Sequence, residues 1–525
     1  MRPMTAPSTE PLSLRRWRGR PAARWWPPGP TAVFVIAAAI VIFRTLVYLR
    51  FEQLAFDSDQ AVVGLMAKHL MEGRAFPLFY YGLTYLLGVE AWAAVPFFFV
   101  VGPTVLALRL SMLVWNLSFA VLVIVGLQRA AGLRAWSAIT PALFFLTAPA
   151  SVSRQLVSAQ GGNIEPFVYV GVLWFLQRHP LWFGAVLAIG ARNREFTLYA
   201  VPVLLVLELL TGDMNRARAR DWLASLVMFC AVWESIEALK PFADFGGPGT
   251  RGQLLGGFSG SQVSNLAAQF NWQASALAER VGRMGGGLTA WLTGAIQIDS
   301  NLPIRPQSWR VWAGGLALVL AAGRLAWLLV RPDQAEVSDR SRVRSRVQAM
   351  ALRVSRARFA FYILGVGVVA IAAFLAGKPG LEGYSRYVLL GLLVPVGLTA
   401  ALLRLEPRTI LRQLTTVVVV GWGALMAVDH ATVLLTYVRS PPSNPAREIA
   451  ERLVAQRIRV ASAGYWEAYT ISFIARERVR VASTDVARIQ EYQNLFVDPA
   501  NRPVLISERP CPAGERVDRW YICRP

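Results

Sequence analysis

Long apolar runs, separated by short basic segments, occupy most of the chain before residue 440. A helix needs roughly 20 apolar residues to cross a bilayer, and the pattern predicts about eleven spans. Their ranges are 31–49, 103–127, 135–150, 164–176, 181–191, 198–210, 222–239, 311–330, 359–376, 387–403 and 414–435. The runs at 164–176 and 181–191 are short, so a broken or re-entrant helix is an alternative there.

Two segments between the predicted spans carry further helical patterns. Apolar residues of 61–71 recur at helical spacing, which predicts a helix lying on the membrane surface. Residues 85–101 contain Glu90 and Pro96, and we interpret them as a second interfacial helix, because a span there would invert the charge bias downstream. Residues 261–283 are amphipathic, and the glycines at 285–287 predict a flexible turn.

The last part of the chain has a different pattern. Short β-type runs at 458–463, 479–482, 504–507 and 520–523 alternate with helical patterns at 446–456, 467–476 and 488–496. Strand–helix–strand order favours a parallel sheet. The fold class predicted is an α-helical polytopic membrane protein with outer-face interfacial helices and a small C-terminal α/β domain.

Charge sets the predicted orientation. The chain is 55% hydrophobic with a mean hydropathy of +0.41 and a formal net charge of +22, and its arginines cluster beside the spans, for example at 15–24 and 340–358. Basic flanks mark the cytoplasmic side and contact anionic membrane lipids, so the charge does not indicate nucleic-acid binding.

This topology predicts three domains. Residues 1–30 form a basic cytoplasmic tail, and 31–439 form the transmembrane module with outer loops at about 50–102, 241–310 and 377–386. Because the span count is odd, residues 440–525 lie outside the cytoplasm. Cys511 and Cys523 bracket the end of this domain, where a disulfide is plausible. The first apolar run lacks a cleavage site of small residues and is long enough to be an anchor.

Two carboxylates, Asp57 and Asp59, follow the first span closely. A carboxylate at a membrane surface costs desolvation energy unless it is solvated, paired or bound to a cation. One of the pair can act as a general base on an acceptor hydroxyl, or both can bind a divalent cation such as Mg or Mn. The structural alternative is that Asp59 caps the helix that follows it. The predicted cofactor set is therefore none, or one divalent cation.

Two groups of cations are candidates for binding phosphate. Lys378 and Arg386 bracket a glycine-containing outer loop, and Arg192 and Arg194 lie at the outer end of the fifth span, against the positive-inside trend. Snorkelling to the interface explains the first pair equally well, and a solvated turn explains the second.

Glu90 and Tyr81 are candidate substrate contacts. An acid on an apolar helix is expected to be paired or functional, and an aromatic residue at the interface serves equally as an anchor. Glu237 and Lys240 have the spacing of a helical ion pair. No His, Cys and Asp pattern has zinc spacing, and there is no P-loop.

Several motifs resemble the first-loop region of bacterial GT-C glycosyltransferases, the group related to dolichyl-phosphate-mannose protein mannosyltransferases and the lipid A aminoarabinose transferase. They are Asp57-Ser58-Asp59-Gln60-Ala61, Gly64-Leu65-Met66-Ala67, Tyr81-Gly82, Glu90-Ala91 and Ala107-Leu108-Arg109-Leu110, with Ser385-Arg386-Tyr387-Val388 and Gly464-Tyr465-Trp466-Glu467-Ala468-Tyr469 further on. The family usually has Asp followed by Glu in the first loop, whereas Gln60 follows Asp59 here, so Asp57 or Glu90 would have to supply a second carboxylate.

The resemblance implies a GT-C fold and an inverting hexosyl- or pentosyltransferase in the bacterial cytoplasmic (inner) membrane. Its donor is a sugar on a polyprenyl phosphate and its acceptor is an envelope glycan, lipid or protein. Asp59 is implied as the base, Lys378 and Arg386 as donor-phosphate ligands, and Tyr387 as part of the substrate site. The rival class is a transporter or a flippase for lipid-linked sugars. Transporters place ionisable groups near the membrane midplane of paired repeats, whereas these acids cluster in outer loops.

Overall fold

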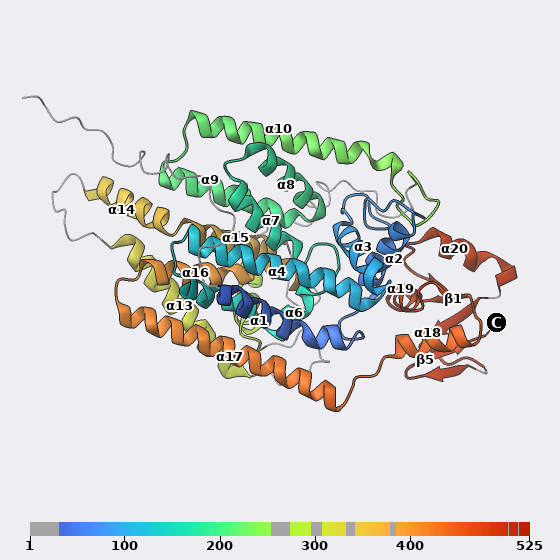
Figure 1. The fold of residues 1–525 in the computed structure, drawn as a ribbon. Coiled ribbons are helices and arrows are strands. Elements are labelled where there is room, and N and C mark those ends of the chain that lie inside the picture. The colour runs from blue at the N-terminus through green and yellow to red at the C-terminus, as the bar shows by residue number, and fades with distance from the viewer. Residues whose placement is uncertain are drawn as a thin grey trace, which may run out of the picture.

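The computed structural model describes residues 31–253, 274–295, 307–331, 342–377, 385–501, 503–512 and 514–524. Figure 1 shows a bundle of helices with a small α/β domain at one end. Within these ranges seven helices are long and apolar enough to cross a membrane, or eight if one bent pair is a single span. They are α1 (Thr31–Arg50), α4 (Val105–Arg129), α10 (Arg216–Ala238) with η2 (Lys240–Phe242), α13 (Ser308–Val330), α15 (Arg358–Gly377), η3 (Ser385–Leu392) with α16 (Leu393–Leu405), and α17 (Thr409–Arg439).

The other four predicted spans coincide with shorter helices: α5 (Ala135–Leu146) with α6 (Ala150–Leu156), α7 (Glu165–Leu176), α8 (Pro180–Asn193), and η1 (Glu195–Tyr199) with α9 (Ala200–Thr211). The broken helix lies at α5 and α6, which meet at 86°, rather than at 164–191. Pro149 precedes α6, and the residue before a proline is disfavoured in helical conformation.

The glycines predicted as a turn at 285–287 lie within helix α12 (Ala274–Leu292), so that prediction is wrong. Helix α14 (Arg342–Arg356) is the basic segment before α15.

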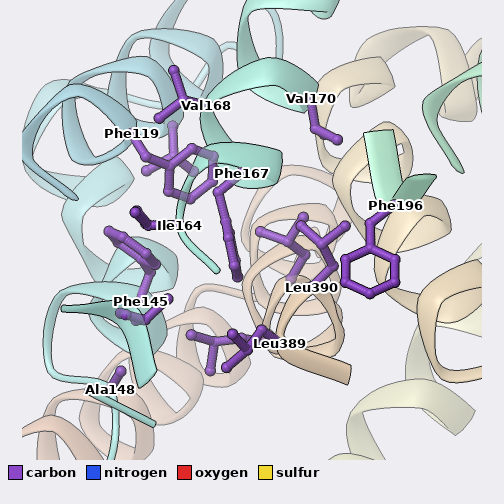
Figure 2. Close-up of a cluster of buried hydrophobic side chains, with 14 of the residues drawn as sticks. Phe119, Phe145, Ala148, Ile164, Phe167, Val168, Val170, Phe196, Leu389 and Leu390 are labelled. Carbon is purple, nitrogen blue, oxygen red and sulfur yellow. The ribbon is translucent and has the colours of Figure 1, made fainter. Parts of the chain in front are cut away.

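Aromatic side chains fill the centre of the bundle. Phe119, Phe145 and Phe167 are fully buried, and the ring of Phe119 lies 4.7 Å from that of Phe145 and 5.2 Å from that of Phe167, between centroids (Figure 2). Such edge-to-face pairs add to the stabilisation that comes from burial. The buried Arg44 donates hydrogen bonds to the Phe145 carbonyl (2.9 Å) and to Asn116 Oδ1 (2.5 Å). A buried cation is thus hydrogen-bonded where water is excluded.

The C-terminal domain is an α/β unit, as the sequence predicts, but its sheet is parallel only in part and contains the unpredicted strand β4. Its sheet has the order β2-β1-β3-β5-β4, with β2, β1 and β3 parallel and β5 antiparallel to both β3 and β4. Cys511 and Cys523 form a disulfide, as expected. The elements are α18 (Pro445–Ala455), β1 (Val460–Ala463), α19 (Tyr465–Ile474), β2 (Arg480–Ser483), α20 (Gln490–Val497), η4 (Pro499–Asn501), β3 (Val504–Ser507), β4 (Glu515–Val517) and β5 (Trp520–Cys523).

The helix predicted to lie on the membrane surface is buried instead. It is α2 (Ser58–Met71), which packs between α19 and α3 (Val89–Val101), and its residues from Ala61 to Ala67 are all fully buried (Figure 1). The spacing of apolar residues predicts one buried face of a helix. The C-terminal domain covers a second face of α2, which this spacing does not predict. The second helix predicted at the interface, at 85–101, coincides with α3.

Replacing Gly64 by alanine is expected to loosen the contact between α2 and α19. A Cβ atom at Gly64 would lie 2.5, 2.7 and 2.9 Å from three atoms of the Phe473 ring. Such overpacking costs about 1–3 kcal/mol, and thermal unfolding in detergent measures it. Gly421→Ala in α17 is the matched control, because a Cβ there meets nothing within 4 Å. Equal unfolding temperatures for the two variants would contradict this close packing.

Candidate functional site

The carboxylate pair lies at the beginning of α2, and its two members have different roles. Asp57 is the N-cap, with extended backbone (φ −135°, ψ 178°), and its Oδ1 accepts a hydrogen bond from the Gln60 amide at 3.1 Å. Asp59 lies in the first helical turn. The capping role predicted as the alternative for Asp59 therefore belongs to Asp57.

Asp59 is partly exposed and meets groups from distant parts of the chain. The Tyr465 hydroxyl donates a hydrogen bond to Asp59 Oδ1 at 2.6 Å, and Arg386 Nη1 lies 3.4 Å from Oδ2. The Tyr80 hydroxyl donates to the Asp59 carbonyl at 2.9 Å, which holds this backbone in place. The side chain keeps 19% of its surface exposed, so a substrate hydroxyl can reach it.

Asp57 is more enclosed than Asp59. Gln160 donates a hydrogen bond to its Oδ2 at 2.5 Å, and the Gln60 side chain lies 3.3 Å from its Oδ1. Burial raises the pKa of Asp57, and the nearby charge of Asp59 raises it further. Asp59 is therefore the more accessible base.

The surroundings of the pair bear on the predicted cation. Amide donors engage both oxygens of Asp57, while a hydroxyl donor and a guanidinium engage those of Asp59. A carboxylate oxygen that accepts one hydrogen bond keeps a lone pair for a metal, so the divalent cation at this pair stays a prediction. Among the residues that the structure describes, no group of three or more His, Cys, Asp or Glu side chains could hold a metal.

Two of the predicted phosphate ligands flank the ring of Tyr387. The guanidinium carbon of Arg386 lies 5.2 Å from the ring centroid, and that of Arg194 lies 5.4 Å from it. Over the described ranges, the Arg194 guanidinium makes no hydrogen bond or ion pair, although the residue is only 9% exposed. A single guanidinium can bind a phosphate through two parallel N–H donors.

The C-terminal domain contributes a third cation. The guanidinium carbon of Arg488 lies 5.6 Å from the ring centroid of Tyr80 and 5.8 Å from that of Tyr465. Both tyrosines bond to Asp59. Sequence reasoning missed Arg488 and the role of Tyr465. The only signal was the motif around Tyr465, which resembles the family but says nothing of its partner.

Arg192, another candidate cation, has partners other than Asp59. Arg192 forms an ion pair with Glu237, and its guanidinium carbon lies 3.6 Å from the Trp233 ring centroid. Glu237 also pairs with Lys240 at 2.6 Å, as the spacing predicted. Lys378 lies outside the described residues, so its role stays a prediction.

Glu90 and Tyr81 are both fully buried. Glu90 Oε1 accepts a hydrogen bond from the Gly162 amide at 2.6 Å, and burial raises the pKa of this carboxyl. The Tyr81 hydroxyl lies 3.1 Å from His69 Nδ1, at the junction with the C-terminal domain. Their predicted contacts with substrate remain predictions.

The long apolar helices define a multi-pass membrane protein, and its polar site lies where the helical bundle meets the α/β domain. No protein-family model matches the chain, and no curated protein matches it. Two solved structures are similar: ArnT from Cupriavidus metallidurans in the apo state (15% identity, TM-score 0.40) and bound to undecaprenyl phosphate (12%, 0.40). Each alignment covers 94% of this chain and 97% of that chain.

Both are structures of ArnT, which belongs to the wider group that the sequence motifs resemble. Identities and TM-scores at this level transfer no activity to this chain.

Proposed function

We propose that this chain is a membrane glycosyltransferase. It moves a sugar from a polyprenyl-phosphate donor to a glycan, lipid or protein of the cell envelope, with inversion at the anomeric carbon. The observation that carries the proposal is the accessible carboxylate of Asp59 beside Arg386, at one end of an apolar bundle. A carboxylate can deprotonate an acceptor hydroxyl, and guanidinium groups bind the phosphate of a lipid donor.

In the proposed reaction Asp59 accepts the proton of the acceptor hydroxyl. The hydroxyl oxygen forms a bond to the anomeric carbon while the bond from that carbon to the phosphate oxygen breaks. The bonding electron pair leaves with the polyprenyl phosphate. Arg386 and Arg194, with Lys378 on the outer loop, stabilise the negative charge that develops there. The steps as written need no metal.

The test uses purified protein in nanodiscs, with radiolabelled polyprenyl-phosphate sugars as donors and with the lipid extract and the delipidated residue of the envelope as separate acceptors. We expect release of free polyprenyl phosphate together with transfer of label to the acceptor. A comparison of envelope glycans between a deletion strain and the complemented strain then identifies the product. Movement of the intact donor across the vesicle membrane, without hydrolysis or transfer of the sugar, would instead favour the rival class, a flippase for lipid-linked sugars.

We further propose that the site faces outward from a bacterial cytoplasmic membrane. Residues 1–30 would be cytoplasmic, 31–439 would form the transmembrane module and 440–525 the outer domain. The arginine bias of the predicted inner loops supports this orientation, and so does the disulfide, which is typical of oxidising compartments.

A reporter enzyme fused to the C-terminus tests this orientation. A periplasmic phosphatase fusion is expected to be active and a cytoplasmic fluorescent reporter dark. The same two reporters fused after Arg331, in the predicted inner loop, are expected to give the reverse pattern. A bright cytoplasmic reporter at the C-terminus would overturn the orientation.

A further inference from the structure

The candidate site is assembled from two domains. Asp59 and Arg386 belong to the helical bundle, whereas Tyr465 and Arg488 belong to the C-terminal domain. Along the chain, residues 440–444 join α17 to this domain. Contacts between the domains must therefore hold Tyr465 against Asp59, because a short linker alone does not fix orientation.

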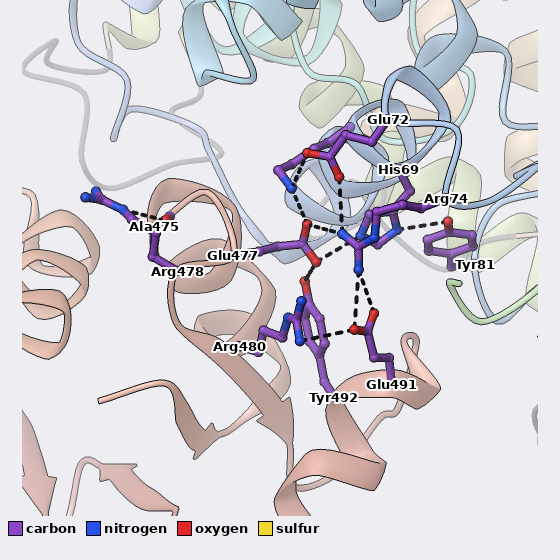
Figure 3. A network of polar contacts seen from close by, with 11 residues as sticks. His69, Glu72, Arg74, Tyr81, Ala475, Glu477, Arg478, Arg480, Glu491 and Tyr492 are labelled. Atoms are coloured by element: carbon purple, nitrogen blue, oxygen red, sulfur yellow. Dashed lines mark hydrogen bonds and ion pairs between the residues drawn. The ribbon is translucent and has the colours of Figure 1, made fainter. Parts of the chain in front are cut away.

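Glu477 accepts hydrogen bonds from four side chains at this junction (Figure 3). Three donors belong to the bundle: Lys68 at 2.5 Å, His69 at 3.0 Å and Arg74 at 3.1 Å. The fourth, Tyr492 at 2.9 Å, belongs to the C-terminal domain. The Glu477 side chain is only 3% exposed, so these bonds form out of water, where losing one partner is costly.

Glu477 lies in a network of ion pairs. Glu72 pairs with Lys68 and Arg74, Glu491 pairs with Arg74 and Arg480, and His69 lies against Glu477 itself. Burial alone would raise the pKa of Glu477, but the hydrogen bonds and charges of His69 and Lys68 outweigh it and hold the pKa well below its usual range. The carboxylate is therefore ionised at neutral pH.

The backbone that presents Glu477 is strained. Arg476 and Glu477 have φ of 53° and 60°, a left-handed backbone conformation that residues other than glycine rarely adopt. Strain of this kind persists where the surrounding contacts compensate for it, and it is common at functional sites. Here the turn that follows α19 directs Glu477 at the end of α2.

Helices α2 and α19 are thus joined at both ends. Tyr465 begins α19 and bonds to Asp59 at the beginning of α2, while Glu477 follows α19 and bonds to Lys68 and His69 near the end of α2. Between these ends, the Phe473 ring packs against Gly64. The two helices run side by side in the same direction, so we expect a shift at Glu477 to reach Tyr465.

We propose that Glu477 is a positioning residue, which clamps the C-terminal domain onto α2 and so places Tyr465 and Arg488 at Asp59. This inference rests on the proposed function, since it names the element that completes the transferase site. Glu477 itself does not touch the reacting atoms.

The primary test is Glu477→Gln, which keeps the shape of the side chain and removes its charge. Glu515→Gln is the matched control, because Glu515 pairs with Arg452 and Gln456 inside the C-terminal domain alone. Hydrogen exchange by mass spectrometry is expected to rise in residues 58–71 and 465–474 of Glu477→Gln and to match wild type in the control. Exchange unchanged in both variants would overturn the clamp. If Glu477→Gln does not fold, Glu477→Asp takes its place, because it keeps the charge at a shorter reach. Hydrogen exchange in the same two segments is expected to rise above that of wild type.

Turnover tests the catalytic part of the inference separately. Glu477→Gln is expected to lower the transfer rate at saturating donor by at least about tenfold, because a misplaced group loses its alignment. The double variant with Tyr465→Phe is expected to be no slower than the slower single variant, since both changes act through one contact. Additive losses, or wild-type turnover in Glu477→Gln, would overturn the positioning role. If wild type transfers no sugar from any donor, the proposed function fails, while hydrogen exchange still decides whether Glu477 is the clamp.

Discussion

Replacing Asp59 by asparagine is expected to lower the transfer rate by about 10²- to 10⁴-fold, the usual contribution of a general base. Asparagine has the same size and can still accept the hydrogen bond from the Tyr465 hydroxyl, so the site keeps its shape. The cap of α2 is also unaffected, because Asp57 provides it. The measurement is turnover of a polyprenyl-phosphate sugar in nanodiscs, with the thermal unfolding temperature recorded beside it.

Asp57→Asn provides the matched comparison. Asparagine is as good an N-cap as aspartate, and we expect the turnover of this variant to fall much less than that of Asp59→Asn. Chelators are expected to leave wild-type activity unchanged. Normal turnover by Asp59→Asn would remove the proposed base. Full loss in both variants together with sensitivity to chelators would show instead that the two carboxylates share a cation.

Replacing Arg386 by alanine is expected to lower turnover by about 10²- to 10³-fold, the effect typical of removing one stabilising donor from a developing anion. Arg386 lies between Asp59 and the ring of Tyr387, where a donor phosphate would approach the base. Negative charge on the phosphate grows as the sugar departs, so the rate falls as well as donor affinity. Donor titration at fixed acceptor separates the two effects.

Arg386→Lys is expected to restore only part of the activity, because lysine keeps the charge but cannot make a bidentate contact. Arg519→Ala serves as the control, since Arg519 is a largely exposed arginine of the C-terminal domain. Its donor titration is expected to match wild type. If Arg386→Ala also kept wild-type saturation and turnover, the phosphate site would have to be sought at Arg194.

Local pattern was sufficient to predict most elements of this chain. The strand at 504–507 and the strand at 520–523 have the predicted bounds, and all eleven apolar runs are helical. Short-range periodicity and propensity determine such elements. The helix lengths were less predictable, since Pro149 and the tertiary packing decide where α5 ends and α6 begins.

The candidate site was predictable only in part. The motif containing Asp57 and Asp59 and the basic positions Arg194 and Arg386 carried enough chemistry to be singled out from the sequence. Arg192 carried the same signal, yet its ion pair with Glu237 binds it elsewhere. Charge and position in a loop identify a candidate, but they do not tell a free cation from a paired one.

By itself, the sequence determined the membrane-spanning character, the α/β tail, the disulfide and the first half of the site, because these depend on composition and on neighbours close in the chain. The tertiary structure alone decided that Tyr465, Arg488 and Glu477 belong with α2, since contacts between residues some 400 positions apart in sequence leave no local pattern. It also decided which of the two aspartates is the cap and which carboxylate is the more accessible, because backbone conformation and burial at one helix start separate them.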